Sequence, residues 1–302
     1  MAEKKTCIGD LLEYLDSLHI KYVFSGDRDT FLEGFSAIDR YKPGTVTWMK
    51  KSMDTDVSVR EAALLVLQEG CTPTGKNFLV TAESKRAFFS IIEKFFCKEK
   101  PVQNHIGQNT FISSEVKLGK NCMIGNNCVL DGDITIEDNV VIEHNVVILN
   151  KVHIGARTVI QSNTVIGEDG FGYMKDENNH RVMIRHYGGV EIGEDVFIAC
   201  HVNISRGTIG DTVIGRHTKL AAFVTIAHNV VLGEDNVAIC SDFYGSSKTG
   251  DNTYVVGSIV RNQKKIGNNV IVGMGTVVTD DIPDGVCVVG APARTINSTE
   301  DL

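Results

Sequence analysis

His228 is the side chain of this sequence best suited to acid–base chemistry. It lies two positions after Ile226, within the segment 225–229 (TIAHN). An imidazole gains and loses a proton near neutral pH, so a histidine here could serve as a general base. On a straight strand His228 would point inward like Ile226, whereas near a corner it would project toward a cleft between subunits. A catalytic role and a structural role therefore both stay open. His201 stands far from it in the sequence without a closely spaced second pair of ligands, so no metal site is predicted.

Two further sets of side chains could hold a phosphate or a base. Arg261, Lys264 and Lys265 form a basic cluster in an acidic chain, and cations of this kind pair with phosphates. An ordinary solvated surface would explain the same cluster. Trp48, the only tryptophan, lies in the apolar segment Thr45–Met49. It could stack on a nucleotide base, although core packing is the simpler interpretation of its surroundings.

The spacing of aliphatic residues predicts the fold that must position these groups. From Ile106 to Ile166 an aliphatic residue recurs at every sixth position, which fits neither a helix nor a single strand. This period is typical of a parallel β-helix of hexapeptide repeats, in which three short strands form one triangular coil and the aliphatic residues stack inside. Glycine and asparagine are frequent between the repeats, and both tolerate the positive φ expected at corners. The pattern returns at Ile192, Ile198, Ile204, Ile214, Leu220, Ile226, Leu232, Ala238, Ile266, Val272 and Val278.

The first hundred residues lack this period and predict a separate domain. We expect a small α/β domain over residues 1–100, which could bind a nucleotide, and the β-helix domain over residues 101–302. A long interruption at 168–191 carries Phe171 and Tyr173 among glycines. Such a loop could wall a cleft against a neighbouring subunit, or it could be a tolerated surface insertion. The elements expected in the first domain are helices at 11–18 and 87–96 and strands at 45–49, 62–67 and 78–80.

Composition excludes several classes of protein. The net charge of −8 argues against nucleic acid as a partner. The sequence begins without an apolar signal region and has no run long enough to span a membrane, so a cytoplasmic protein is expected. Its eight cysteines include no C-x-x-C pair. Cys122 and Cys128, six positions apart, are predicted to be reduced and to pack inside the coils.

Several segments together resemble a known enzyme family over nearly the whole chain. The similarity is to the UDP-3-O-acylglucosamine N-acyltransferases of lipid A synthesis. The segments that carry it are 34–39 (GFSAID), 43–48 (PGTVTW), 167–173 (GEDGFGY), 202–207 (VNISRG), 211–215 (DTVIG) and 226–233 (IAHNVVLG).

The resemblance implies a left-handed β-helix, a homotrimer and three active sites between subunits. It implies a nucleotide-sugar acceptor with a free 2-amine, a thioester donor on acyl carrier protein, and no tightly bound cofactor. His228 matches the family's general base, which would take a proton from the attacking amine, while a backbone N–H at a corner could hold the oxyanion. Trp48, Phe171 and Tyr173 would contact the nucleotide sugar, and Met274 matches a methionine near the end of the acyl groove.

Three positions depart from the family pattern. Ala221 and Ala222 replace an Asp-Asn pair, so His228 is expected to lack a carboxylate neighbour. The region of Gln263 and Lys264 replaces a later Gly-His pair. Residues 51–54 (KSMD) replace the segment that contacts uracil, which puts recognition of that base in doubt.

The end of the chain resembles a different group of enzymes. Segments 273–278, 282–285 and 289–294 are similar to the closing coil of coenzyme-A-dependent hexapeptide acetyltransferases, and no helical tail for carrier protein follows. Arg294 would then contact the phosphates of coenzyme A, together with Arg261, Lys264 and Lys265. Three functions result: the lipid A N-acyltransferase, an acetyl-CoA-dependent N-acetyltransferase of a nucleotide sugar for surface polysaccharide, or a trimeric binding protein whose active site has decayed.

Overall fold

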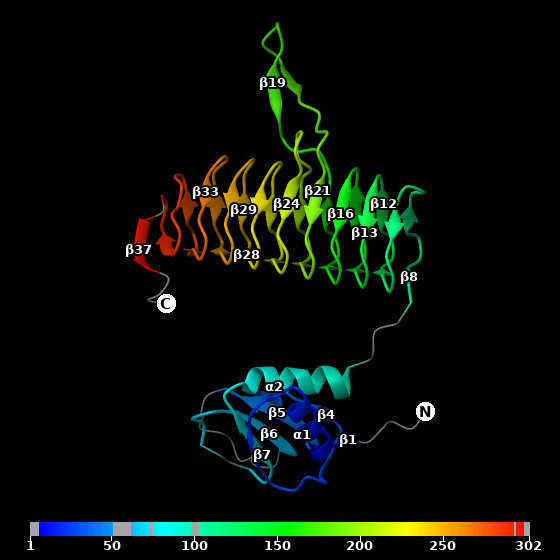
Figure 1. Cartoon of the computed structure of the whole chain (residues 1–302), viewed down its shortest axis with the longest axis vertical. Coiled ribbons are helices and arrows are strands. Elements are labelled where there is room, and N and C mark those ends of the chain that lie inside the picture. Colours follow the sequence, from blue (N-terminus) through cyan, green and yellow to red (C-terminus); the bar gives the residue numbers. More distant parts are fainter. Residues whose placement is uncertain (1–5, 51–61, 73–74, 98–102, 293, 299–302) are drawn as a thin grey trace. The chain divides into compact units, whose positions relative to one another are not determined.

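The computed structural model describes residues 6–50, 62–72, 75–97, 103–292 and 294–298 (Figure 1). The chain divides into two compact units, residues 1–100 and 101–302. Residues 51–54, expected near uracil, lie outside the described part.

The first unit is a small α/β domain built on a five-stranded sheet. The strands run in the order β2 (Val23–Ser25), β7 (Phe78–Thr81), β6 (Leu64–Gln68), β5 (Thr45–Met49) and β4 (Gly34–Phe35), and all neighbours are parallel except β2 and β7. Helix α1 spans Ile8–Ser17, and α2 spans Ser84–Ile91 before a π-helical turn at Ile92–Phe96. The remaining elements are β1 (Thr6–Cys7), β3 (Phe31–Leu32) and a 3₁₀ turn at Ile38–Arg40.

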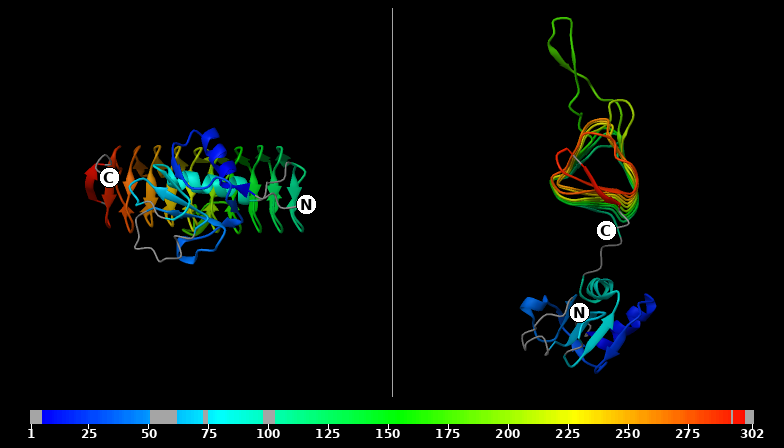
Figure 2. Two further views of the ribbon diagram at one scale, coloured as in Figure 1. Left: turned by 90° about the horizontal axis from the view of Figure 1, so that it is seen from below. Right: turned by 90° about the vertical axis from the view of Figure 1, so that its left-hand side faces the viewer.

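The second unit is a parallel β-helix whose three faces are three sheets (Figure 2). The first face contains β8 (His105–Ile106), β11 (Met123–Ile124), β14 (Val141–Ile142), β17 (Val159–Ile160), β22 (Phe197–Ile198), β25 (Lys219–Leu220), β28 (Val237–Ile239), β31 (Tyr254–Val256), β34 (Ile271–Val272), β36 (Val286–Val289) and β37 (Arg294–Ser298). The second contains β9 (Phe111–Ile112), β12 (Val129–Asp131), β15 (Val147–Leu149), β18 (Val165–Ile166), β23 (Asn203–Ile204), β26 (Thr225–Ile226), β29 (Asp242–Phe243), β32 (Ile259–Val260) and β35 (Val277–Val278). The third contains β10 (Lys117–Leu118), β13 (Ile134–Ile136), β16 (Val152–Ile154), β21 (Val190–Ile192), β24 (Thr212–Ile214), β27 (Val231–Leu232), β30 (Lys248–Thr249) and β33 (Lys265–Ile266).

Each coil passes from the first face to the second, then to the third, and back to the first. We call these three bends the entry corner, the exit corner and the return corner. The predicted β-helix of hexapeptide repeats is confirmed, because strands one coil apart pair in register, as Ile142 does with Ile160.

The repeated aliphatic residues fill the interior of the coils. Ile142, Ile160 and Ile226 are at most 1% exposed, whereas Ile106 is 50% exposed because it lies in the first coil, where one side of the stack is open. The repeat also shortens: Phe243 pairs with Ile226 and Val260, so the inward step from Ala238 to Phe243 takes five residues. The six-residue pattern does not reveal this change of register.

At the corners, the expectation that glycine and asparagine both supply a positive φ holds for asparagine but not for most of these glycines. Asn127 and Asn163 adopt the left-handed conformation as predicted, with φ of 57° and 64°. The glycines that follow inward aliphatic residues, such as Gly107 and Gly125, are not needed for positive φ. They are needed for space, because a Cβ on Gly107 would lie 2.5 Å from the backbone carbon of Gly125 in the next coil. Gly167, with φ of 93°, does follow the expected rule.

The insertion folds as an antiparallel hairpin that stands out from the β-helix (Figures 1 and 2). Its strands are β19 (Tyr173–Lys175) and β20 (Arg181–Met183), and they are exposed. Regular coil resumes in β21 at Val190, slightly earlier than expected, because Val190 and Ile192 both point inward.

The described cysteines are free thiols, and Cys122 and Cys128 are buried just before β11 and β12. Burial is the largest influence on the pKa of Cys122 and raises it above its ordinary value. Within the described residues, no helix has the length and apolar character needed to cross a bilayer.

Candidate functional site

A cavity of about 570 Å³ opens at the exit corner beside His228. Its walls come from five segments: the start of the insertion, with Asp169 and Phe171; Asn203 and Ser205 in the coil before His228; the segment holding His228; the turn 244–246 one coil later; and Asn262–Gln263 one coil further on. His228 lies in the turn after β26 and is partly exposed, so it projects at a corner rather than into the core. The coils thus bring together residues that are remote in sequence.

Asn229 orients the imidazole of His228. The NH2 group of Asn229 donates to the carbonyl of Gly210 at 2.8 Å, so its Oδ1 must face the other way. That oxygen accepts from Thr208 and lies 3.1 Å from Nδ1 of His228. Since a carbonyl oxygen only accepts, Nδ1 of His228 carries the proton in the neutral ring. The other nitrogen, Nε2, is then a bare acceptor, which is the state required of a general base.

Gly245 lies against the reactive edge of this ring. A Cβ on Gly245 would be 2.8 Å from both Cε1 and Nε2 of His228, so only glycine leaves the ring in place. The N–H of Ser246 donates to the His228 carbonyl at 2.9 Å, whereas that of Gly245 donates no hydrogen bond within the described part of the chain. An unpaired backbone N–H beside the proton acceptor suits an oxyanion.

Polar contacts anchor the base of the insertion. Arg206 donates through Nε to the carbonyl of Gly188 at 2.7 Å and lies 3.9 Å from the carboxylate of Asp169. The carboxylate of Asp211 accepts from the N–H of Gly189 at 2.6 Å and pairs with Lys151 at 3.0 Å. Burial is the largest influence on the pKa of Asp211 and acts to raise it. The hydrogen bond from Gly189 and the two hydrogen bonds from Lys151 outweigh burial and hold the pKa below its ordinary value.

The insertion and the basic cluster both reach this corner. Phe171, 88% exposed, lines the cavity, and the ring of Tyr173 lies 4.8 Å from it. Arg261 and Lys264 directly flank the cavity-lining residues Asn262 and Gln263, and Lys265 begins the next strand. Lys248 pairs with Lys265 on the neighbouring strand and extends the cluster. Lys248 could not be assigned to this cluster from the sequence, because the two lysines are one full coil apart.

Met274 and Arg294 lie elsewhere in the subunit. Met274 occupies the turn between β34 and β35 at the entry corner, where it is 80% exposed. Arg294 starts β37 opposite Val289, beside the first face. Neither residue therefore lies beside His228 of its own subunit.

Ala221 and Ala222 also lie at the entry corner, between β25 and β26. A carboxylate at Ala221 would be at the opposite end of β26 from His228, so within one subunit the loss of that family residue removes no neighbour of the base. Asn229 and Thr208 are the partners of the ring.

Trp48 belongs to the first unit and packs there. Its Nε1–H donates to Ser84 at 2.9 Å, and its ring stacks on Phe88 at 6.2 Å with its edge toward Phe89. These contacts favour core packing, and stacking on a base stays a prediction.

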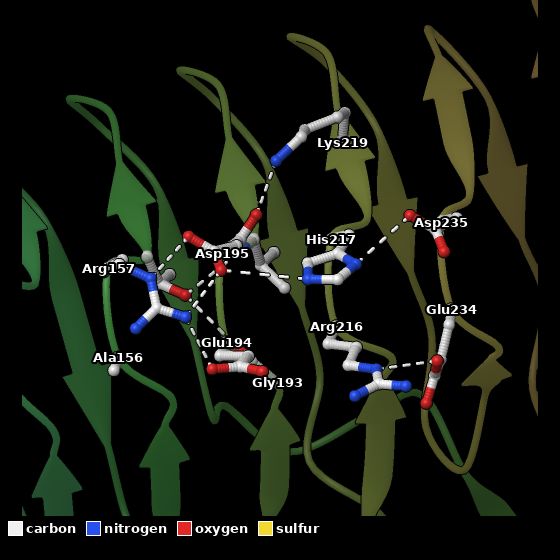
Figure 3. A network of polar contacts seen from close by, with 12 residues as sticks. Ala156, Arg157, Gly193, Glu194, Asp195, Arg216, His217, Lys219, Glu234 and Asp235 are labelled. Carbon is white, nitrogen blue, oxygen red and sulfur yellow. Dashed lines mark hydrogen bonds and ion pairs between the residues drawn. The ribbon is translucent and has the colours of Figure 1, made fainter. Parts of the chain in front are cut away.

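A second polar cluster occupies the return corner (Figure 3). Glu194, Asp195 and His217 lie close enough to share one ion. However, the guanidinium of Arg157 already pairs with both carboxylates, at 2.6 and 2.7 Å. Its hydrogen bonds are the main reason that the pKa of Asp195 is lowered. This cluster is a network of ion pairs between partly exposed side chains.

Comparisons with known proteins agree with the geometry. Residues 133–168 match the bacterial transferase hexapeptide (six repeats) model. A UDP-3-O-acylglucosamine N-acyltransferase of Coxiella burnetii is 31% identical over 292 residues, covering 89% of this chain and 85% of that protein. The protein of that name from Bordetella parapertussis is 35% identical over 126 residues, or 40% of this chain and 35% of its own.

Solved structures support the fold. The UDP-N-acetylglucosamine acyltransferase of Bacteroides fragilis superimposes with a TM-score of 0.58 at 24% identity, covering 65% of this chain and 76% of that one. That of Francisella novicida has a TM-score of 0.60 at 20% identity, with coverage of 66% and 71%. The predicted left-handed β-helix is confirmed. Because the Coxiella burnetii relative matches most of both chains above 30% identity, this protein belongs to the UDP-3-O-acylglucosamine N-acyltransferase family.

Proposed function

We propose that this protein transfers an acyl group from a thioester to the amine of a nucleotide-linked amino sugar. The observation that carries the proposal is His228, held at the edge of a cavity with Nδ1 directed to Asn229 and Nε2 left as an acceptor. The names of the relatives point to 3-O-acylated glucosamine on UDP as the acceptor.

The proposed reaction uses His228 as base and then as acid. The amine attacks the thioester carbonyl while Nε2 of His228 takes a proton from the nitrogen. The carbonyl oxygen becomes an oxyanion, which the N–H of Gly245 can stabilise. As this intermediate collapses, the C–S bond breaks, and the imidazolium returns its proton to the departing thiolate. The products are an amide and a free thiol. General base catalysis of this kind contributes roughly 10²–10⁴ in rate.

We further propose that the working unit is a trimer with the site shared between subunits. Met274 and Phe223, 80% and 65% exposed, give the entry corner an apolar surface. A neighbouring copy that placed its entry corner against the exit corner would cover these side chains and close the cavity beside His228. Light scattering should give a mass near three times the 33.0 kDa chain. A monomer at micromolar concentration would remove the shared site.

The donor is proposed to carry a phosphopantetheine arm, whose phosphate would pair with Arg261, Lys264, Lys265 and Lys248 near the cavity. Acyl carrier protein and coenzyme A share this chemistry, so the two must be compared directly. Replacing Arg261 and Lys265 with alanine should raise the KM for the donor, whereas replacing Lys120, far along the coils, should not. A strong effect of Arg294→Ala on coenzyme A binding would favour the acetyl-CoA function. Lack of a tightly bound cofactor and a cytoplasmic location stay predictions.

The test is a transfer assay with UDP-linked 3-O-acylglucosamine and either acylated carrier protein or acetyl-CoA, followed by mass spectrometry of the N-acylated product. His228→Ala should lower turnover by roughly 10²–10⁴. His217→Ala, which removes a partly exposed histidine at the return corner, is the matched control. Near-normal turnover in a folded His228→Ala variant would remove His228 as the base. Failure of the wild type with both donors would favour the decayed binding protein.

A further inference from the structure

His186 is a buried histidine that the proposed reaction does not use. It lies on the return leg of the insertion, between β20 and β21, and is 4% exposed. Its ring packs edge-to-face against that of His228, with ring centroids 5.2 Å apart and an angle of 72° between the planes. The insertion therefore places a second imidazole directly beside the proposed base.

Hydrogen bonding determines which nitrogen of His186 carries the proton. Its Nδ1 lies 2.9 Å from the carbonyl oxygen of Ile184, which can only accept, so Nδ1 is the donor. In the neutral ring Nε2 is then a bare acceptor. This atom is buried and has no hydrogen-bond partner among the described residues. A buried polar atom left without a partner destabilises the fold, and one in a native protein calls for an explanation.

The unpaired nitrogen faces His228 across a glycine. A Cβ on Gly170 would lie 3.0 Å from Nε2 of His186 and 2.8 and 2.9 Å from Cβ and Cδ2 of His228. A side chain at position 170 would thus contact both Nε2 of His186 and the side of the His228 ring. A larger residue would push the two rings apart.

We infer that His186 is a positioning residue for His228, holding its ring and stabilising the imidazolium that forms during acyl transfer. This inference rests on the proposed role of His228 as base. The lone pair on Nε2 is the negative end of the imidazole dipole. Buried beside the ring of His228, it stabilises the positive charge that develops on that ring during the reaction.

Other charged or titratable groups near His228 act alongside this dipole. Glu168 and Asp169 line the cavity from the insertion, and Tyr244 lines it from the next coil. Arg206 lies 3.9 Å from Asp169 and offsets part of its charge. None of these explains the buried nitrogen, since an apolar ring at position 186 would fill the same space without leaving a polar atom unpaired.

The test compares two replacements of His186. His186→Phe keeps a ring but removes both nitrogens, and His186→Gln restores an acceptor. His186→Phe should lower kcat about fivefold to twentyfold with KM unchanged, because it acts on the charged state formed after binding. Its melting temperature should equal or exceed that of the wild type, because an unpaired buried atom has been removed. His186→Gln should recover part of kcat.

A second measurement does not depend on turnover. Carbethoxylation of His228 by diethyl pyrocarbonate, followed by peptide mass spectrometry, should be slower in His186→Phe than in the wild type, because attack through Nε2 also builds positive charge on the ring. Unchanged kcat and carbethoxylation in folded His186→Phe would overturn the inference. A fall in kcat that comes with a lower melting temperature and a higher KM would also overturn it, since packing alone would explain that result. His228→Ala, assayed in parallel, separates this outcome from failure of the base assignment itself.

Discussion

Gly245 offers a sharp test of whether the geometry around His228 matters for catalysis. The change Gly245→Ala adds one methyl group, and its Cβ would lie 2.8 Å from Cε1 and Nε2 of His228. Carbon atoms in ordinary contact are about 3.5–4.0 Å apart, so the ring or the turn must shift by about 0.7–1.2 Å. Gly245 itself is not among the residues with a positive φ, so the backbone of the turn accepts alanine at this position.

A displacement of this size should act on the chemical step. Misplacing a catalytic group by about 1 Å costs roughly 10² in rate, because the reacting atoms no longer approach along the productive path. We therefore expect kcat to fall about a hundredfold in Gly245→Ala while the fold and its melting temperature are retained. The assay is steady-state transfer with saturating donor and acceptor.

Gly210→Ala is the matched control, because a Cβ on Gly210 meets nothing within 4 Å. Its carbonyl would still accept from Asn229. Activity should remain near that of the wild type. If Gly245→Ala and Gly210→Ala have equal turnover, then the contact of Gly245 with the His228 ring does not matter for catalysis.

Three further predictions concern the base, the insertion and the core. Asn229→Ala should lower kcat about tenfold, which is the equivalent of one hydrogen bond. Asn163→Ala is the control, because both positions have a left-handed φ, of 60° and 64°. Equal rates in the two variants would show that Asn229 does not orient the ring of His228. Because its folded pKa is lowered, Asp211 contributes stability that is fully present above its ordinary pKa of 3.8 and is lost as the pH falls through the lower folded value. Urea unfolding should therefore show Asp211→Asn destabilised at pH 7, with its difference from the wild type shrinking as the pH falls below 3.8; a constant difference would contradict this. Ile226→Ala should cost about 2–5 kcal/mol of unfolding free energy because Ile226 is 0% exposed, whereas Ile209→Ala, at 83% exposure, should change it by less than about 0.5 kcal/mol.

Part of the site could be predicted from local sequence. Ile226 belongs to the inward repeat. His228 could then point inward on a straight strand or outward at a corner, and the turn after β26 places it at a corner. The basic residues Arg261, Lys264 and Lys265 lie in one short segment of the sequence, so their clustering needed no tertiary information. The expectation that His228 lacks a carboxylate neighbour because of Ala221 stays a prediction: within one subunit the two residues lie at opposite ends of β26, so only a second copy could bring them together.

The sequence by itself determined the β-helix, since a period of six aliphatic residues has one stable arrangement, in which each coil buries the side chains of the next. Only the tertiary structure decided what surrounds the base. Gly245 and Asn262 reach His228 from following coils, and the inward step from Ala238 to Phe243 is shorter than the repeat, so no fixed spacing identifies them. His186 reaches His228 because the hairpin folds back onto the coil through Arg206, Asp169 and Asp211. Contacts of this kind depend on how a whole insertion packs, and that is decided by burial and hydrogen bonding between distant residues rather than by local pattern.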